Sequence, residues 1–209
     1  MSSSSIPDHL VRVLIASVRA TLLQRSSSDD PIAQEARRVL QGLDPALLQT
    51  AEFEESQHPI VHIGASATAN PCPATSSLVE SLRPVLSHLP WQYNYPDRAD
   101  APALGERIAF AEIIGPVAPW ISPTVCVGFT LIAPHTYYPM HHHPATELYY
   151  VLAGNATWDL RGVTQLRAPG TFILHPSEAE HAMRTNHEPL LALYTWSGTD
   201  VRTTSVYAF

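Results

Sequence analysis

The side chains best suited to chemistry lie together in residues 141–154, which read HHHPATELYYVLAG. Three histidines come first, and a carboxylate and two tyrosines then lead into an apolar segment. Read as a strand, a loop and a second strand, the stretch places His141 and His143 on one face, because side chains alternate along a strand with a period of two. His142 then points to the other face, and Pro144 ends the first strand.

The second strand of this stretch carries Glu147, Tyr149 and Val151 on one shared face. Two imidazoles, a carboxylate and a phenol can therefore converge on one point. Nitrogen and oxygen donors of intermediate softness suit Zn, Fe, Mn, Ni or Cu, and three or four of them leave a position open for substrate. The pattern predicts a metal centre, and a surface cluster of histidines is the competing interpretation.

A second motif, PGTFILHPSEAEHAM, occupies residues 169–183. A Pro-Gly turn starts a short strand, His175 and Pro176 end it, and His181 opens the next strand. The spacings HxHxxxE and PG-x5-P-x4-H together resemble the two signature motifs of the cupin superfamily. By that resemblance, one divalent transition metal (Zn, Fe, Mn or Ni) has four ligands: His141, His143, Glu147 and His181. We expect His175, which precedes a proline, to be a hydrogen-bonded structural histidine.

The composition excludes several classes of function. The chain has 209 residues, enough for one domain with a full core and an appendage, or for two small domains. Its net charge of -7 and its lack of any basic run give no footprint for nucleic acid or an anionic membrane. All 12 basic residues are arginine, so Schiff-base chemistry on lysine is excluded.

The cysteines and the first apolar run carry no special signal. Cys72 and Cys126 have no CxxC spacing and imply no disulfide framework. Residues 10–23 are interrupted by Arg12 and Arg19 and are shorter than the roughly 20 residues that a membrane span needs. They also lack the features of a signal peptide, so a cytoplasmic protein is expected.

The first part of the chain predicts helices. Ser5 and Asp8 have capping-box spacing, and apolar residues then recur at helical intervals until the polar run 25–30. Asp30 and Pro31 mark the start of a second helix, and a similar Asp-Pro pair at 44–45 marks a short third one. Residues 56–75 are expected to form a loop.

A further capping box at Ser77 and Glu80 predicts a helix that reaches about residue 89, which Pro84 should kink if it lies inside. We therefore expect a helical segment, residues 1–90, that packs on the rest of the chain because isolated short helices are marginal.

Residues 91–106 are expected to form an extended connection, and the pattern then changes to many short strands. Apolar or alternating segments separated by Gly and Pro turns occupy residues 107–114, 124–133, 147–153, 156–160, 164–166, 171–174 and 190–196. This spacing indicates a jelly-roll barrel over residues 107–209, the architecture to which cupins belong. The expected fold is mainly β: a cupin double-stranded β-helix preceded by an α-helical segment.

The sequences YYPMHHHPATELYYVLAG and HPSEAEHAMRT resemble more than a generic cupin. They are similar to the cupin-type dimethylsulfoniopropionate lyases (DddQ, DddL and relatives), which carry a mostly helical segment ahead of a metal-binding barrel. The tyrosine that precedes the first histidine in this family corresponds to Tyr138, and the tyrosine after the fourth-ligand position corresponds to Tyr149. The ending LYTWSGTD is a looser match to the Trp-containing ending of the family.

The resemblance implies a carbon-sulfur lyase that forms dimethyl sulfide and acrylate by β-elimination, with a small carboxylate and sulfonium compound as substrate. Such a reaction needs a base for the proton alpha to the carboxylate, while a metal stabilises the enolate-like charge. Tyr149 is the first choice for the base; a ligand or hydrogen-bonding role is the alternative. Tyr138 is second and also suits substrate orientation. Trp196 and Trp120 are candidates for cation-π contact with the sulfonium, or for core packing.

Two other classes of function stay open. An iron dioxygenase or an isomerase can use the same ligands, since a fold does not determine its chemistry, and a non-enzymatic cupin can simply hold a small ligand. The tyrosines that flank the histidines favour the lyase, because a dioxygenase needs open iron positions and no phenolic base. The sequence does not decide the role of His135, and a homodimer is one of the assemblies that remain open.

Overall fold

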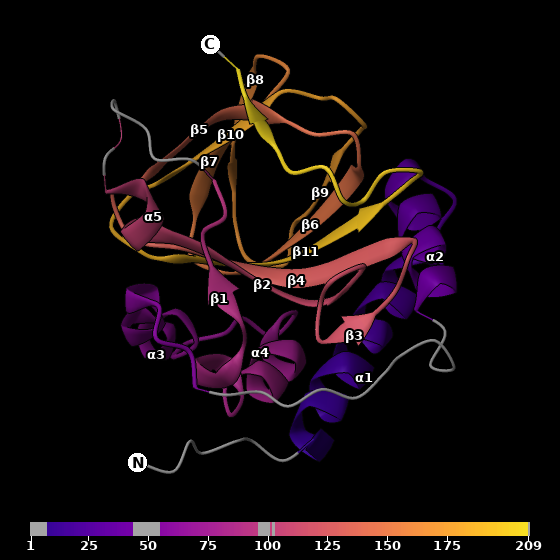
Figure 1. Cartoon of the computed structure of the whole chain (residues 1–209), viewed down its shortest axis with the longest axis horizontal. Helices are drawn as coiled ribbons and strands as arrows, with labels where there is room; N and C mark the ends of the chain where they lie inside the picture. The colour runs from indigo at the N-terminus through magenta and orange to yellow at the C-terminus, as the bar shows by residue number, and fades with distance from the viewer. Residues whose placement is uncertain (1–7, 44–54, 96–100, 102, 209) are drawn as a thin grey trace.

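Two β-sheets build the barrel in the computed structural model, which describes residues 8–43, 55–95, 101 and 103–208 (Figure 1). The larger sheet has the strand order β1-β2-β4-β11-β6-β9, with β3 paired to β2, and the smaller one has the order β12-β5-β10-β7-β8. The larger sheet comprises β1 (Trp91–Gln92), β2 (Ile108–Gly115), β3 (Trp120–Ile121), β4 (Val125–Ile132), β6 (Thr146–Ala153), β9 (Phe172–His175) and β11 (Leu190–Ser197). The smaller sheet comprises β5 (Tyr137–His142), β7 (Ala156–Leu160), β8 (Val163–Arg167), β10 (His181–Thr185) and β12 (Val206–Tyr207).

The expected double-sheet barrel is confirmed, and each predicted strand forms within a residue or two of its predicted ends. The sequence missed β1, β3 and β12, since each has only two residues and shows no periodicity. β1 and α5 (Leu104–Arg107) both fall in the segment expected to be an extended connection. Gly154 makes the β6–β7 turn possible: its φ is +75°, and a Cβ there would collide with the Pro189 carbonyl oxygen.

Both faces of the larger sheet are covered, which explains why β4 is buried along its whole length. Side chains on one face pack against the helices, while those on the other face, such as Tyr149 and Tyr194, point into the barrel. The two faces therefore have different tasks: one holds the helices, and the other can build a site.

The helices agree in part with the sequence prediction. They are α1 (Asp8–Arg25), α2 (Pro31–Gly42), η2 (Pro59–Ile63), α3 (Gly64–Ala67), α4 (Ser76–Leu82) and η3 (Leu86–His88). α1 ends at the predicted polar run, and Asp30 caps α2 by accepting a 3.0 Å hydrogen bond from the Ala33 amide. The capping-box residue Ser5 and the Asp-Pro pair at 44–45 lie outside the described residues.

Two helix predictions were wrong. The segment expected to be a loop contains η2 and α3, because His58 and Pro59 start a 3-10 turn there. Ser77 is not the N-cap of α4; Thr75 is, and it makes no side-chain cap hydrogen bond. α4 stops at Leu82, two residues before Pro84, so the chain breaks there instead of bending within one helix.

The helices and the outer face of the larger sheet share one hydrophobic cluster. Leu14 and Leu22 of α1 are fully buried in it, together with Leu78 of α4 and Phe129 of β4. Figure 1 shows α1, α3 and α4 along one side of this sheet. Among the described residues, no helix is both long and apolar enough to cross a bilayer.

Candidate metal centre

His141 and His181 face each other across the smaller sheet. They are partners in the register of β5 and β10, and their ring centroids lie 4.0 Å apart. Both side chains are buried. His143 follows β5, and its ring centroid lies 5.2 Å from that of His181. His142 points outwards, where its Nδ1 lies 2.6 Å from the Glu178 carboxylate, as strand alternation predicts.

One hydrogen-bonding pattern is shared by His141, His143 and His181. Nδ1 faces a backbone carbonyl oxygen in His141 (Pro139, 2.7 Å), His143 (Ala145, 3.0 Å) and His181 (Ala179, 2.7 Å). Because a carbonyl oxygen only accepts, each Nδ1 carries the proton and each Nε2 is left with its lone pair. This is the tautomer and orientation of a metal-binding histidine.

Glu147 is oriented by its two neighbours across the sheet. In the register of the larger sheet it lies between Trp196 of β11 and His175 of β9. Trp196 donates from Nε1 to one carboxylate oxygen at 2.8 Å, and His175 donates from Nδ1 to the other at 2.9 Å. Trp158 in turn donates to His175 Nε2 at 2.9 Å. Both nitrogens of His175 are therefore used, which confirms it as a structural histidine.

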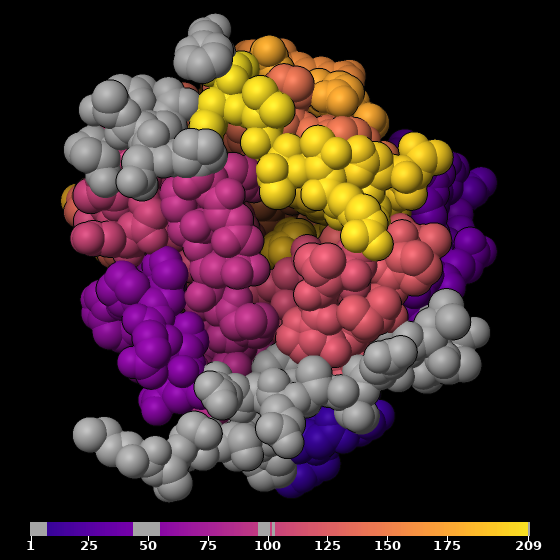
Figure 2. Space-filling view, in the orientation of Figure 1, coloured from indigo at the N-terminus to yellow at the C-terminus, as the bar shows by residue number. Residues whose placement is uncertain are grey.

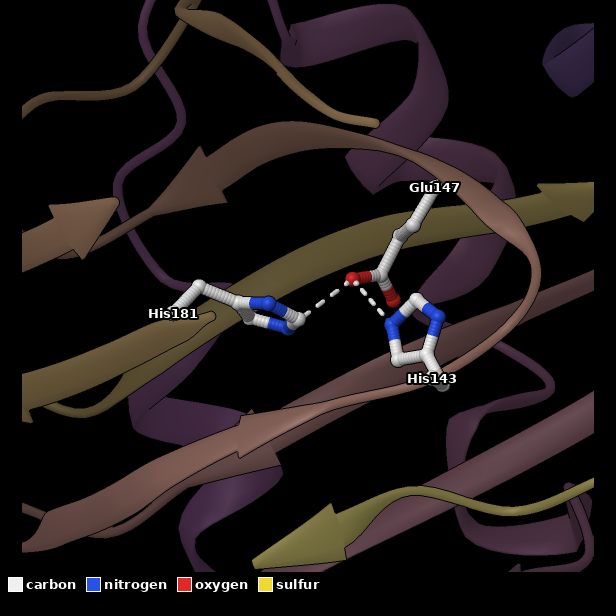
Figure 3. A group of neighbouring side chains, drawn as sticks. All are labelled: His143, Glu147 and His181. Atoms are coloured by element: carbon white, nitrogen blue, oxygen red, sulfur yellow. Dashed lines mark hydrogen bonds and ion pairs between the residues drawn. The ribbon is translucent and has the colours of Figure 1, made fainter. Parts of the chain in front are cut away.

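His143, Glu147 and His181 offer ligand atoms that all lie within 4.8 Å of one another (Figure 3). Nε2 of His143 lies 3.2 Å from Glu147 Oε2, and Nε2 of His181 lies 3.4 Å from the same oxygen. These spacings match neighbouring donors around one ion, because bonds of about 2.1 Å place such donors roughly 3.0 to 3.4 Å apart.

The donor set also favours a positive charge close to Glu147. Nε2 of His181 is buried and makes no hydrogen bond within the described part of the chain. Lone pairs that face a carboxylate oxygen repel it unless a positive charge lies between them. The residues thus fit a divalent metal held by His143, Glu147 and His181. His141 is not part of this group of converging donor atoms, but its ring lies 4.0 Å from that of His181 on the adjacent strand.

Most of the protonation states fit this set of ligands. His143 is the exception: burial lowers its pKa, but the Glu147 carboxylate more than offsets this and holds that pKa above its ordinary value. Burial alone would raise the pKa of Glu147, but the neighbouring His143 and the hydrogen bonds from histidines hold it well below its ordinary value. Burial, together with the like charge that the adjacent His181 would carry if protonated, lowers the pKa of His141 well below its ordinary value. For His175, burial and the same charge lower the pKa to about 4. A carboxylate and neutral imidazoles are the forms that bind metal.

A cavity of about 280 Å³ opens beside these ligands. Its inner wall includes His141, His143, Glu147, Tyr138, Tyr149 and Trp196, and further wall residues are Tyr95, Phe110, Glu112 and Tyr194. Figure 2 shows a hollow in the surface, framed by magenta atoms near β1, red atoms near β3 and the yellow C-terminal segment.

Of the two tryptophans predicted to contact the substrate, one lines the cavity and the other does not. Trp196 lines the cavity and stacks near His143, with ring centroids 4.4 Å apart. Trp120 does not lie with the cavity residues; it is buried in the cluster that joins the larger sheet to the helices, so it is placed as a core residue. His135 lines a separate surface depression and packs edge-on against His187.

Tyr138 and Tyr149 approach the candidate ligand group from opposite sheets. The ring of Tyr138 stacks on His141 with centroids 4.0 Å apart. The Tyr149 hydroxyl accepts a long hydrogen bond of 3.5 Å from Thr130. Burial raises the pKa of both phenols well above its ordinary value, so both are neutral unless a nearby cation favours the phenolate.

Sequence reasoning missed Tyr95, Phe110, Glu112 and Tyr194 as cavity residues. Phe110 and Glu112 lie two residues apart and so share one face of β2, and Tyr194 shares a face of β11 with Trp196 in the same way. Strand alternation was therefore the one feature of the sequence that could have indicated these residues. They lie near the candidate ligands because of the order of the strands in the sheet. That order cannot be read from the spacing of the motifs.

The fold and the group of buried histidines and glutamate define a cupin barrel. Within that class, the family model described as dimethylsulfoniopropionate lyase matches residues 32–192, and the chain belongs to this family.

Two named relatives agree with that assignment. DddL of Cereibacter sphaeroides, named as a dimethylsulfoniopropionate lyase, is 30% identical over 190 residues, covering 86% of this chain and 79% of that protein. The dimethylsulfoniopropionate lyase DddQ of Ruegeria pomeroyi is 33% identical over 120 residues, covering 57% of this chain and 59% of that protein. The crystal structure of the Ruegeria enzyme has a TM-score of 0.75 at 26% identity, covering 96% of this chain and 97% of that one.

Proposed function

We propose that this protein cleaves dimethylsulfoniopropionate into dimethyl sulfide and acrylate by a metal-dependent β-elimination. The observation that carries the proposal is the cavity, in which the ligand group, two phenols and further aromatic side chains line one space. Membership in the lyase family supplies the substrate.

His141, His143, Glu147 and His181 are the residues that would hold the metal. When bound, the metal supplies Lewis acidity for the substrate carboxylate, which stabilises the negative charge that develops during proton removal.

Tyr149, in the phenolate form that a nearby bound dication would favour, takes the proton alpha to the carboxylate and becomes the neutral phenol. The electrons of that C–H bond form the double bond of acrylate, the Cβ–S bond breaks, and its electrons leave with dimethyl sulfide. The sulfonium needs no acid, because it departs as a neutral molecule. The position of Tyr149 beside Glu147 on β6, inside the cavity, supports this role.

Tyr138 orients the substrate from the opposite sheet. Its ring is fixed by stacking on His141, and its side chain also lines the cavity. Trp196 supports the site by donating to Glu147 while its ring forms part of the wall. The aromatic wall also keeps water away from the developing charge.

The decisive experiment measures products. Purified, metal-loaded protein is mixed with dimethylsulfoniopropionate, dimethyl sulfide is measured in the headspace and acrylate in solution. We expect equal amounts of both products without oxygen consumption. Oxygen uptake in step with substrate loss would indicate a dioxygenase instead, and binding without any product would indicate a ligand-holding cupin.

A further inference from the structure

Glu112 lies in the same cross-strand row as the proposed base. The register runs from Glu112 of β2 to Gly128 of β4, then to Tyr194 of β11 and Tyr149 of β6. Directly paired residues point to the same face of a sheet, so this row crosses the inner wall of the barrel. Glu112, Tyr194 and Tyr149 all line the cavity.

Local backbone features aim the Glu112 side chain. The register of β2 and β4 shifts between Glu112 and Ile114, and such a bulge re-aims the side chains beside it. The carboxylate folds back over Gly115, where a Cβ would collide with Oε1. At Gly128, a Cβ would lie 2.7 Å from the Tyr194 ring, so the missing side chain makes room for that ring. The space between Glu112 and Tyr149 is therefore lined by an aromatic ring.

The charge of Glu112 is poorly compensated. Burial raises the pKa of this carboxyl, although the Cys126 thiol lies within hydrogen-bonding reach. Among the ion pairs of the described residues, none involves Glu112. Arg202 also lines the cavity but is exposed to solvent. Glu147, in contrast, is held by three histidines and a tryptophan.

The distance between Glu112 and Tyr149 along the row suits a short zwitterion. Three strand steps of about 4.8 Å separate Glu112 from Tyr149, so their Cα atoms are roughly 14 Å apart at most along the sheet. Both side chains extend inwards and shorten that gap. Three single bonds of about 1.5 Å or slightly more join the carboxyl carbon of the substrate to its sulfur, which gives a charge separation of roughly 4 Å.

We infer that Glu112, with the rings of Tyr194 and Phe110, forms the subsite for the cationic onium end of the substrate and thereby selects zwitterions over simple carboxylates. A dimethylsulfonium group has no N–H or O–H to donate, so only charge and aromatic faces can recognise it. Phe110 and Tyr194 supply such faces edge-on to each other, with centroids 6.3 Å apart. Glu112 supplies the charge. The inference rests on the proposed function for the identity of the ligand.

Calorimetric titration of metal-loaded protein tests the inference with two ligands of similar shape. One is 3-(trimethylammonio)propionate, a zwitterion whose onium end is permanently cationic and a poor leaving group. The other is 4,4-dimethylpentanoate, a carboxylate in which an uncharged tert-butyl group replaces the onium end. Glu112→Gln removes the charge but keeps an acceptor for Cys126. Glu35→Gln, at a buried glutamate outside the cavity, is the matched control.

We expect Glu112→Gln to weaken binding of the onium ligand roughly 10- to 100-fold and to change binding of the carbon analogue by less than about twofold, as for a charge pair at about 5 Å in a partly wet site. Glu112→Asp keeps the charge and should keep the preference, which covers the case in which the glutamine variant folds poorly. Equal weakening of both ligands, or an unchanged preference, would overturn the inference.

A negative result in the titration and a negative result in the product assay can be told apart. If wild-type protein releases dimethyl sulfide and Glu112→Gln retains its preference for the cation, the onium subsite is wrong and the lyase function stands. If no dimethyl sulfide appears but the preference disappears in Glu112→Gln, the subsite stands and the proposed reaction is wrong.

Discussion

At the scale of single residues, the orientation of Glu147 depends on a side chain that is not itself a ligand. His175 donates to the carboxylate and accepts from Trp158, so it links the core of the barrel to the ligand group. Such supporting hydrogen bonds fix ligand orientation, and their loss typically lowers metal affinity by about 10- to 100-fold.

We therefore expect His175→Phe, which keeps a ring but removes both nitrogens, to lower metal affinity by about 10- to 100-fold in a chelator competition assay. His142→Phe is the control, because this histidine lies next to the ligands in sequence but faces outwards towards Glu178. Unchanged affinity in the His175 variant would mean that Trp196 alone positions Glu147.

Tyr149→Phe tests the base directly. The change removes the hydroxyl and keeps the ring that packs against Trp158, with centroids 5.1 Å apart. We expect kcat to fall about 10²- to 10⁴-fold with metal content little changed. Loss of metal would make Tyr149 a ligand. Near-normal kcat, with an inactive Tyr138→Phe, would exchange the roles of the two tyrosines.

His141, His143 and Glu147 could be grouped from the sequence because they lie within seven residues, where strand alternation applies. His181 followed only from the resemblance of its motif to the cupin signature.

Trp196 was named from its residue type, but its hydrogen bond to Glu147 and the place of Glu112 in the cavity depend on strand pairing across the larger sheet. Trp120 was named as a site candidate but lies in the core. The sequence of a two-residue strand does not show which face of the sheet its aromatic residue occupies.

At the scale of elements, α2 meets β11 through one buried carboxyl. Ser197 donates to Glu35, and Arg38 lies 3.8 Å from the same side chain. Burial, the largest influence, raises the pKa of Glu35 in the folded protein, and the contacts with Ser197 and Arg38 only partly oppose it. The folded state therefore binds this proton more tightly than the unfolded chain does.

The sign of the pH effect follows from this raised pKa. The contribution of Glu35 to stability is fully present below its unfolded pKa and is lost as pH rises through the higher, folded pKa. Glu35→Gln keeps the acceptor for Ser197 without a charge, so we expect a more stable protein at neutral pH and a flatter stability profile from weakly acidic to neutral pH. Urea unfolding over that range measures both, and Glu80→Gln on the exposed side of α4 is the control. Lower stability of Glu35→Gln at neutral pH would show that the ionised carboxylate is net favourable.

Strands were easier to predict than helix ends. The strands of the barrel have alternating or apolar patterns bounded by Gly and Pro, and both signals are local. The end of α4 and the start of η2 depend on prolines whose effect varies with the surrounding contacts. Ser77 had the right spacing for a cap, but α4 starts one residue before it, at Ser76.

At the scale of the whole molecule, we propose that the helical segment and the barrel form one cooperative unit. Leu14 of α1 and Phe129 of β4 belong to the same buried cluster, and α1 also contacts α2 and α4. Removing residues 1–90 would expose the apolar outer face of the larger sheet. We expect that truncated chain to lose solubility or to melt at a much lower temperature.

A point substitution tests the same idea without exposing that face. Leu14 is fully buried, and Leu14→Ala should cost about 2–5 kcal/mol through lost burial and a cavity. For a chain of this size that lowers Tm by roughly 5–20 °C. If helices and barrel are one unit, the helical signal and the near-ultraviolet signal of the barrel tyrosines and tryptophans shift together in a single transition. Leu23→Ala, on the exposed face of the same helix, is the matched control and should leave Tm nearly unchanged. Separate transitions, with barrel melting unaffected by Leu14→Ala, would instead show that the helices are an appendage and that the barrel holds its metal ligands without them.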